Sequence, residues 1–524
     1  MKKRYYLLTL LILLLSIALY GCSGKKKTEV KEQTPNTDDV VMVEPSYGGS
    51  VVVGILQDLD SLDPHKAVAA GTKEVLFNIF EGLVKPDKEG NLVPALASDY
   101  EISPDGLVYT FSLREGIKFH NEEAVTAQDV KYSIERCAGL LDEKDPSVVV
   151  DTALSNIKKV NVKDEKTIEI LLKESNTELL GYLTVPIIPK DYKEGDTKPV
   201  GTGPFQFVSY TPLESMVIEK NPYYYEEGKP YLDKVTFKII ANADAALMEL
   251  QAGSIDIFPY LTDSQAQQLE GTMNILEGHM NLVQGLFLNN KVSPFDNIKV
   301  RKALNYAVDK QAILDMVAGG RGSIISTNMF PAYTKYYLEE LNDVYPNDVN
   351  KAKDLLKEAG FPDGFTFTIT VPSNYQYHVD TAQVIVEQLK EIGVTAKIKQ
   401  VEWATWLSEV YTNRDYEATI VGLDARLSPR DAMDRYEAKA SNNFVNYSNK
   451  EYDKTLDMAI KTIDEEEKVE DYHKLQTLLT EDAASVYLQD PPLLVAMNKK
   501  LGGYTFYPVY VQDMSTVYFI DESN

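Results

Sequence analysis

The side chains that bind metals or act as nucleophiles are few in this chain, and they are scattered. Five histidines occur in 524 residues, and no two have the His-x-x-x-His spacing that places both imidazoles on one helical face. They are His65, His120, His279, His378 and His473. No Gly-x-Ser-x-Gly elbow, phosphate-binding loop or dinucleotide fingerprint is present. The sequence therefore predicts no enzyme, no cofactor and no protein-ligated metal.

The one spacing with a chemical consequence lies at the N-terminus. Lys2–Arg4 form a basic start, and the apolar run Tyr5–Leu19 is shorter than the roughly 20 residues that a membrane span needs. After Tyr20 come Gly21 and Cys22, and a small residue at the place of Gly21 is typical of an export signal. The pattern resembles the lipobox of bacterial lipoproteins, which implies a signal peptide over 1–21 and a lipidated Cys22. An uncleaved signal anchor is the alternative.

The charge balance excludes two classes of partner. Asp and Glu number 79 against 53 Lys and Arg, which gives a net charge of -26. Nucleic-acid binding depends on cations that neutralise phosphates, and docking on anionic lipid has the same requirement. An acyl chain on Cys22 would then be the membrane link. The only other cysteine, Cys137, would have no disulfide partner, and we expect it to be a small buried residue.

Strand and helix patterns alternate after a polar stretch, residues 22–47, that we interpret as a flexible tether. Residues 365–371 and 394–398 alternate at period two, and the segment between them, 380–393, has apolar residues at helical spacing. This order predicts a crossover unit in a mixed α/β sheet. The roughly 480 residues that remain exceed one hydrophobic core, so we expect two or three lobes.

Several longer segments resemble, in the same order, the peptide/nickel class of ABC-transporter substrate-binding proteins, also called extracellular solute-binding protein family 5. They run from Ser61-Leu62-Asp63-Pro64-His65-Lys66 to Asn446-Tyr447-Ser448 and include residues 78–84, 92–97, 104–106, 119–121, 125–130, 133–136, 201–205, 221–225, 296–309 and 352–360. The resemblance implies a lipid-anchored receptor that captures a small solute, most readily a dipeptide or oligopeptide. It would deliver this ligand to ABC permease subunits, as a monomer and without chemistry.

The implied fold is α/β and two-lobed, like periplasmic binding proteins, with mixed β-sheets, a hinge between the lobes and an extra subdomain on the first lobe. We expect the lobe I core over 48–75, 200–290 and 496–524, the extra subdomain over 76–199, and lobe II over 291–495. The cysteine count and the long tether favour attachment to the outer face of the cell membrane of a single-membrane bacterium. In a two-membrane bacterium the protein would be periplasmic.

The resemblance also suggests ligand contacts. In oligopeptide binders, the segment after Leu-Asp-Pro lends main-chain groups to an extended peptide. The matching residues here include Ala69, Ala70 and Gly71. Trp403 and Trp406, the only tryptophans, either lean into the cleft or pack in the second lobe.

The second-lobe segment 421–429 leaves three interpretations open. Asp424 can pair with a peptide ammonium, as an acid does in peptide binders. Arg426 can instead bind a carboxylate or phosphate through its planar fork of donors. The third interpretation is a surface pair of Asp424 with Arg426 that contributes little. Accordingly, the alternatives to a peptide importer are a binder of a non-peptide anionic solute or metal chelate, and a peptide-sensing lipoprotein. An extracytoplasmic hydrolase is a distant third.

Overall fold

The computed structural model describes residues 45–141, 145, 148, 150–151, 153–240, 242–425 and 427–521. The predicted signal peptide, Cys22 and most of the predicted tether lie outside the described residues, as does Arg426. Among the residues that are described, none of the helices combines the length and the apolar character needed to cross a membrane.

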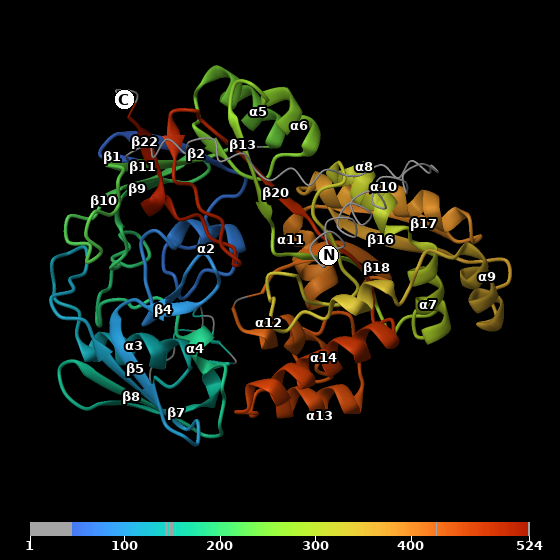
Figure 1. The fold of residues 1–524 in the computed structure, drawn as a ribbon, viewed down its shortest axis with the longest axis horizontal. Helices are drawn as coiled ribbons and strands as arrows, with labels where there is room; N and C mark the ends of the chain where they lie inside the picture. Colours follow the sequence, from blue (N-terminus) through green and yellow to red (C-terminus); the bar gives the residue numbers. More distant parts are fainter. Residues whose placement is uncertain are drawn as a thin grey trace, which may run out of the picture. The chain divides into compact units, whose positions relative to one another are not determined.

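Lobe I is built on a seven-stranded mixed sheet (Figure 1). In this sheet β2 (Ser50–Ile55) pairs in parallel with β11 (Lys234–Ile239), whereas β9 (Phe205–Thr211) and β10 (Ser215–Lys220) are antiparallel. The strand order is β13 (Asn274–His279), β20 (Pro492–Met497), β12 (Ile257–Phe258), β2 (Ser50–Ile55), β11 (Lys234–Ile239), β10 (Ser215–Lys220) and β9 (Phe205–Thr211). Its helices are α2 (Ala70–Leu76), α5 (Ala243–Ala252) and α6 (Asp263–Leu269).

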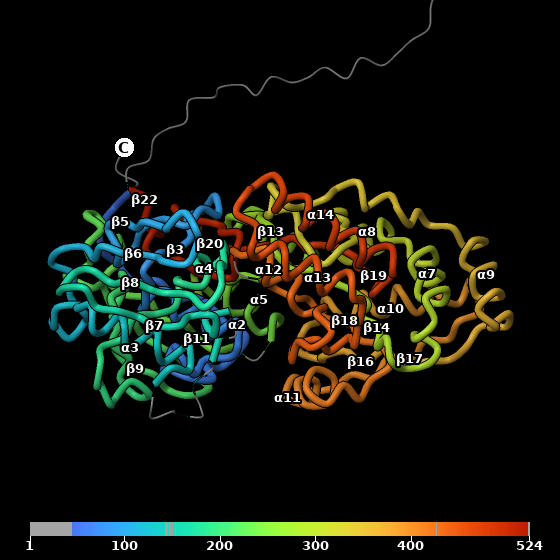
Figure 2. Tube along the Cα trace, turned by 90° about the horizontal axis from the view of Figure 1, so that it is seen from below, coloured from blue at the N-terminus to red at the C-terminus, as the bar shows by residue number. Residues whose placement is uncertain are grey.

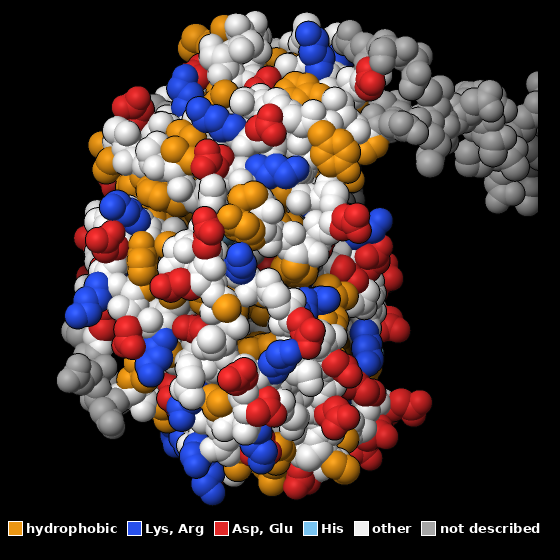
Figure 3. Space-filling view, turned by 90° about the vertical axis from the view of Figure 1, so that its left-hand side faces the viewer, with side chains coloured by type: hydrophobic (Ala, Val, Ile, Leu, Met, Phe, Trp, Pro, Cys, Tyr) orange, Lys and Arg blue, Asp and Glu red, His pale blue; other side chains and the backbone are white. Residues whose placement is uncertain are grey.

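A small three-stranded sheet joins the two ends of the described chain. Its strands are β1 (Pro45–Ser46), β22 (Tyr518–Ile520) and β21 (Leu501–Gly502), and Pro45 pairs with Ile520. The C-terminal segment therefore returns to lobe I, as the colours in Figure 2 also show. The face of this half of the molecule in Figure 3 carries acidic and basic side chains interspersed with small apolar patches.

An extra subdomain follows α2 and has its own core. A β3–β4 hairpin (Val84–Pro86, Leu92–Pro94) leads into an antiparallel sheet in the order β5 (Ala97–Ile102), β6 (Val108–Leu113), β8 (Thr167–Leu172), β7 (Ile157–Val162). Helix α3 (Ala127–Cys137) starts with a capping box between Thr126 and Asp129, and the short α4 spans Leu179–Tyr182. Cys137 is buried as predicted, and burial raises the pKa of its thiol to about 12.

Lobe II is a six-stranded sheet covered by helices. Its order is β15 (Ser323–Ile324), β19 (Val486–Asp490), β14 (Val283–Leu288), β18 (Ala418–Leu423), β16 (Thr366–Pro372), β17 (Thr395–Val401). The predicted crossover is confirmed: β16 and β17 are parallel and α10 connects them. The helices are α7 (Ile298–Ala307), α8 (Lys310–Ala318), α9 (Val349–Glu358), α10 (Gln376–Lys390), α11 (Trp403–Trp406), α12 (Pro429–Met433), α13 (Lys450–Ala459) and α14 (Glu465–Glu481).

In the described chain, the polypeptide passes between the two large sheets twice, once between β13 and β14 and once between β19 and β20. We call residues 280–282 and 490–491 the hinge pair. The two passages are neighbours, because His279 pairs with Pro492 and Met280 N–H donates to the Pro491 carbonyl at 3.0 Å. The predicted lobe boundaries at 290 and 495 thus fall beyond β14 and inside β20, respectively.

Asp490 is a fully buried carboxyl group in this hinge pair. Its Oδ1 accepts from the Leu282 N–H at 3.1 Å, and its Oδ2 has no hydrogen-bond partner among the described residues. Burial raises the pKa of Asp490 to about 8. The folded protein therefore holds a proton here that the unfolded chain releases near pH 4.

This proton makes stability depend on pH with a defined sign. Between about pH 4 and 8 the folded state binds more protons than the unfolded state, so the free energy of unfolding falls as pH rises, by up to about 1.4 kcal/mol per pH unit. Asp490→Asn removes that term, and we expect a flatter pH dependence in urea unfolding at pH 5, 6.5 and 8. Asp105→Asn, on an exposed turn, is the control. Equal slopes for wild type and Asp490→Asn would contradict the assignment.

Candidate functional site

A cavity of about 890 Å³ lies between lobe I, the extra subdomain and lobe II. Lobe I contributes α2 and the segment 505–516, the subdomain contributes residues near 81–93 and 181–186, and lobe II contributes residues between 411 and 442. Aromatic hydroxyl-bearing rings recur in the wall, from Tyr224, Tyr411, Tyr507 and Tyr510. A cleft of this size and composition is typical of sites that enclose a small ligand.

Helix α2 turns one face toward the cavity. Ala70, Lys73 and Phe77 line it, at the i, i+3 and i+7 spacing of a single helical face. The predicted main-chain contacts are restricted by Asp60, whose Oδ2 accepts from the N–H groups of Val68 (2.7 Å) and Ala69 (3.1 Å). These two amides are therefore already bonded. Of Ala69, Ala70 and Gly71, only Ala70 is among the residues that line the cavity.

Lys73 also lines the cavity, and no motif of the sequence predicts it as a site residue. It is exposed, and among the described residues its ammonium group has neither an ion-pair partner nor a hydrogen-bond acceptor. The other lysines of the wall do have acidic partners within the structure: Lys85 and Lys229 contact Glu226, and Lys88 contacts Glu89. Lys73 follows Ala70 by three residues, which places both on one helical face, and this spacing is the feature of the sequence that indicates Lys73 as a cavity residue.

Asp424 lies on the opposite wall, in the loop that follows β18. Its side chain is exposed, and the Arg435 guanidinium donates to its backbone carbonyl at 2.8 Å. Asp434 lies in the same wall, and burial raises the pKa of its carboxyl group to about 6. Arg426 lies outside the described residues, so its contact with a ligand or with Asp424 stays a prediction.

The two tryptophans pack within lobe II instead of lining the cavity. Their rings stack at 5.0 Å between centroids and 8° between planes. Trp406 is buried and its Nε1–H donates to the Thr419 hydroxyl at 2.9 Å, while Trp403 meets Tyr375 edge-on. Trp406 belongs to a hydrophobic core cluster of lobe II and the half-buried Trp403 packs against that cluster, and neither is among the residues that line the cavity.

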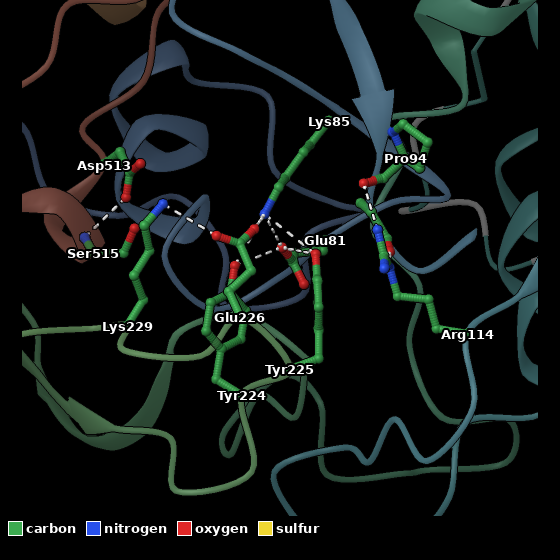
Figure 4. Close-up of polar contacts among 12 residues, drawn as sticks. Glu81, Lys85, Pro94, Arg114, Tyr224, Tyr225, Glu226, Lys229, Asp513 and Ser515 are labelled. Atoms are coloured by element: carbon green, nitrogen blue, oxygen red, sulfur yellow. Dashed lines mark hydrogen bonds and ion pairs between the residues drawn. The ribbon is translucent and has the colours of Figure 1, made fainter. Parts of the chain in front are cut away.

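A buried ionic cluster joins the subdomain to lobe I in the wall of the cavity (Figure 4). The Lys85 ammonium lies between the carboxylates of Glu81, at 3.0 Å, and Glu226, and it also contacts the hydroxyls of Tyr224 and Tyr225. Burial opposes the charge on Lys85, but the attraction of the carboxylates outweighs it, so the pKa of Lys85 is raised. The lysine therefore neutralises this wall and is not free for a ligand.

Replacing Lys85 by Met should destabilise the fold. Glu81 would keep a buried carboxylate with no cation beside it, which we expect to lower the free energy of unfolding by about 2 kcal/mol or more. Lys88→Met is the matched control, because Lys88 and Glu89 are both exposed, and its effect should stay within about 0.5 kcal/mol. Urea unfolding of the three proteins measures both values, and comparable small losses would contradict a structural role for Lys85.

Three findings place the chain among known proteins. The family model described as "Bacterial extracellular solute-binding proteins, family 5 Middle" matches residues 91–444. The chain is similar to the glutathione-binding protein GsiB of Salmonella typhimurium, with 30% identity over 484 residues that cover 87% of this chain and 92% of GsiB. Among solved structures it is similar to the periplasmic binding protein DppA of Helicobacter pylori in complex with the peptide STSA, at 28% identity, a TM-score of 0.81, and coverage of 91% and 99%.

A third relative has a different ligand. AgaA of A. tumefaciens R10, solved with agropinic acid, is 28% identical with a TM-score of 0.79, and the match covers 90% of this chain and 99% of AgaA. Proteins with similar folds thus bind ligands of different chemistry. The class of ligand depends on the residues that line the cavity.

Proposed function

The chain belongs to family 5 of the bacterial extracellular solute-binding proteins, and on that premise we propose that it captures a short zwitterionic peptide between its lobes. As a member of the family it is the extracytoplasmic substrate-binding component of an ABC importer for peptides or related solutes. The proposal adds the class of ligand, the residues that hold its ends and the lipid anchor.

One observation carries the choice of a zwitterion. The cavity wall has an exposed acid on lobe II, Asp424, and an exposed lysine on lobe I, Lys73, that lacks an acidic partner among the described residues. A free peptide has an ammonium at one end and a carboxylate at the other. Asp424 would hold the ammonium and Lys73 the carboxylate, each by a charge-assisted hydrogen bond.

The overall charge of the cavity disfavours the alternative of an anionic solute. Acidic side chains outnumber basic ones among the described lining residues, and most of the basic ones already contact carboxylates. An anion without a compensating ammonium would meet net repulsion there. The cavity volume of about 890 Å³ also lies within the range, roughly 300 to 1,000 Å³, of sites for small ligands.

Membrane attachment is the second part of the proposal. Cys22, lipidated after removal of residues 1–21, would tether the protein through the polar segment that ends near Tyr47. A monomer held in this way stays close to the permease to which it passes its ligand. Metabolic labelling with a radioactive fatty acid should mark the wild type and not Cys22→Ser.

Native mass spectrometry of protein purified without denaturation tests the ligand class first. We expect a ladder of co-purified masses that fragmentation identifies as short peptides. A single discrete non-peptide mass would contradict the proposal and move attention to Arg426. Empty protein would be followed by thermal-shift screening with dipeptides, tetrapeptides and glutathione.

Substitution at both ends of the cavity tests the assigned contacts. Loss of one charge-assisted hydrogen bond costs about 1.5 to 3 kcal/mol, so Asp424→Asn should weaken binding of a free peptide roughly 10- to 100-fold in titration calorimetry. Lys73→Met should weaken it to a similar degree.

Modified peptides make this test specific. N-acetylation should abolish the effect of Asp424→Asn, and C-terminal amidation should abolish the effect of Lys73→Met. Lys88→Met is the control for general charge loss. If Arg426→Met has the largest effect and acetylation does not matter, the anionic alternative replaces this proposal.

A sensor lipoprotein would share every feature described so far. Deletion of the gene separates the two functions, because an importer predicts loss of peptide uptake, whereas a sensor predicts normal uptake and a lost response to extracellular peptide.

A further inference from the structure

The extra subdomain inserts one carboxylate into lobe II beside the ligand cavity, and this residue, Glu178, is not itself among the residues that line the cavity. Glu178 directly precedes α4, and only 2% of its side chain is exposed. Four lobe II groups surround the carboxylate: the hydroxyls of Ser428 and Tyr472, the Arg430 N–H at 3.2 Å, and the Lys468 ammonium at 3.8 Å. We call this arrangement the Glu178 socket.

Glu178 is held in place by the subdomain, and the groups around its carboxylate are held in place by lobe II. On the subdomain side, the Asn176 side chain accepts from Glu178 N–H at 3.0 Å, and the Asn176 carbonyl accepts from the Tyr109 hydroxyl of β6 at 2.8 Å. On the lobe II side, Lys468 and Tyr472 lie four residues apart on α14 and so share one helical face. Glu178 therefore moves with the subdomain, and its partners move with lobe II.

Two further contacts extend the same interface. Thr177 N–H donates to the Ile460 carbonyl at 3.1 Å, and Tyr182 donates to Asp431 at 2.9 Å. An exposed ion pair, Glu174 with Lys461 at 2.8 Å, lies at the rim. In Figure 1, α4 faces α12 and α14 on the side of the molecule remote from β13 and β20, the two strands that adjoin the hinge pair.

We propose that Glu178 is a positioning residue for ligand capture: its socket holds the lobes closed from the side opposite the hinge and so sets the affinity without touching the ligand. Opening the lobes at the hinge pair must withdraw Glu178 from Ser428, Arg430, Lys468 and Tyr472 together. In the open state Glu178 and Lys468 both regain water, whereas in the closed state Glu178 is the buried partner of Lys468, whose other acidic neighbour is the exposed Glu465. The inference goes beyond the proposed peptide function and holds for any ligand enclosed by the same closure.

The physical chemistry of the socket favours a moderate bias toward the closed state. Burying an ion pair loses hydration that the new contacts only partly return, so a complete socket stabilises closure modestly. Removal of Glu178 leaves the buried Lys468 ammonium with only the exposed Glu465 carboxylate, at 4.0 Å, which penalises closure. Ligand affinity then weakens by the factor by which the closed population falls.

Hydrogen exchange on the full protein reports the socket directly. The Thr177 amide donates across the interface but not to Glu178, so its protection measures the interface and not the altered side chain. We expect Glu178→Ala to speed exchange at Thr177 on the order of 10-fold or more and to raise the radius of gyration in small-angle scattering. Binding of the peptide Ser-Thr-Ser-Ala should weaken by a comparable factor.

Matched variants separate this role from a general effect on folding. Glu178→Gln keeps the size of the side chain and removes its charge, and it should act in the same direction if Glu178→Ala does not fold. Glu174→Gln removes the exposed ion pair at the same interface and should change exchange by less than about twofold. Amides within the lobe II sheet should keep their wild-type exchange rates in every variant.

Three results would overturn the proposal. They are a Thr177 amide unprotected in the wild type, equal exchange and scattering in wild type and Glu178→Ala, and faster exchange spread evenly through the lobe II sheet. If the wild type binds no peptide, the proposed function fails, but exchange at Thr177 and the scattering still decide the role of Glu178.

Discussion

In the described part of this protein, two neighbouring segments of the chain connect the two large sheets. Because His279 pairs with Pro492, and Gln284 with Gln489 on the other side, these passages run as one antiparallel ribbon. A ribbon of this kind can bend and twist, but it cannot let the lobes separate or slide freely. The cavity depends on this constraint, since its walls come from both sides of the ribbon and meet only when the lobes approach.

The charges around the cavity are largely neutralised by the protein itself. Lys85 is enclosed by two carboxylates and two phenols, which neutralise its charge within the protein. Lys73 and Asp424 differ because each is exposed on an opposite wall. In a cleft with most charges compensated, these two side chains can decide the orientation and ionisation of the ligand.

The Glu178 socket and the hinge pair lie on different sides of the same cavity. The hinge pair restricts how the lobes approach, and the socket adds contacts that form only after they have met. A binding protein for an importer has to close on its ligand and also release it. A modest bias from a buried ion pair suits both demands, because strong closure would hinder release.

Local patterns in the sequence determined the elements and much of their order. The crossover of β16, α10 and β17 follows from its periodicity, and Asp348 caps α9 as its side-chain type predicts, although α10 begins at Gln376, a turn before the predicted start. The collinear motifs identified the family and therefore the two lobes. Asp424 was found as a candidate because it lies next to a motif position.

Only the tertiary structure decided which residues share a wall. Ala69 and Trp406 were reasonable candidates, but Asp60 takes the amide of the first, and the sheet of lobe II buries the second. Lys73, Lys85 and Glu178 carry no motif of their own, since a lysine or glutamate usually faces water. Lys85 meets Glu226, Glu178 meets Ser428, and Lys73 shares a cavity with Asp424, although each pair is more than a hundred residues apart in the sequence. A sequence does not record which distant groups will exclude water together.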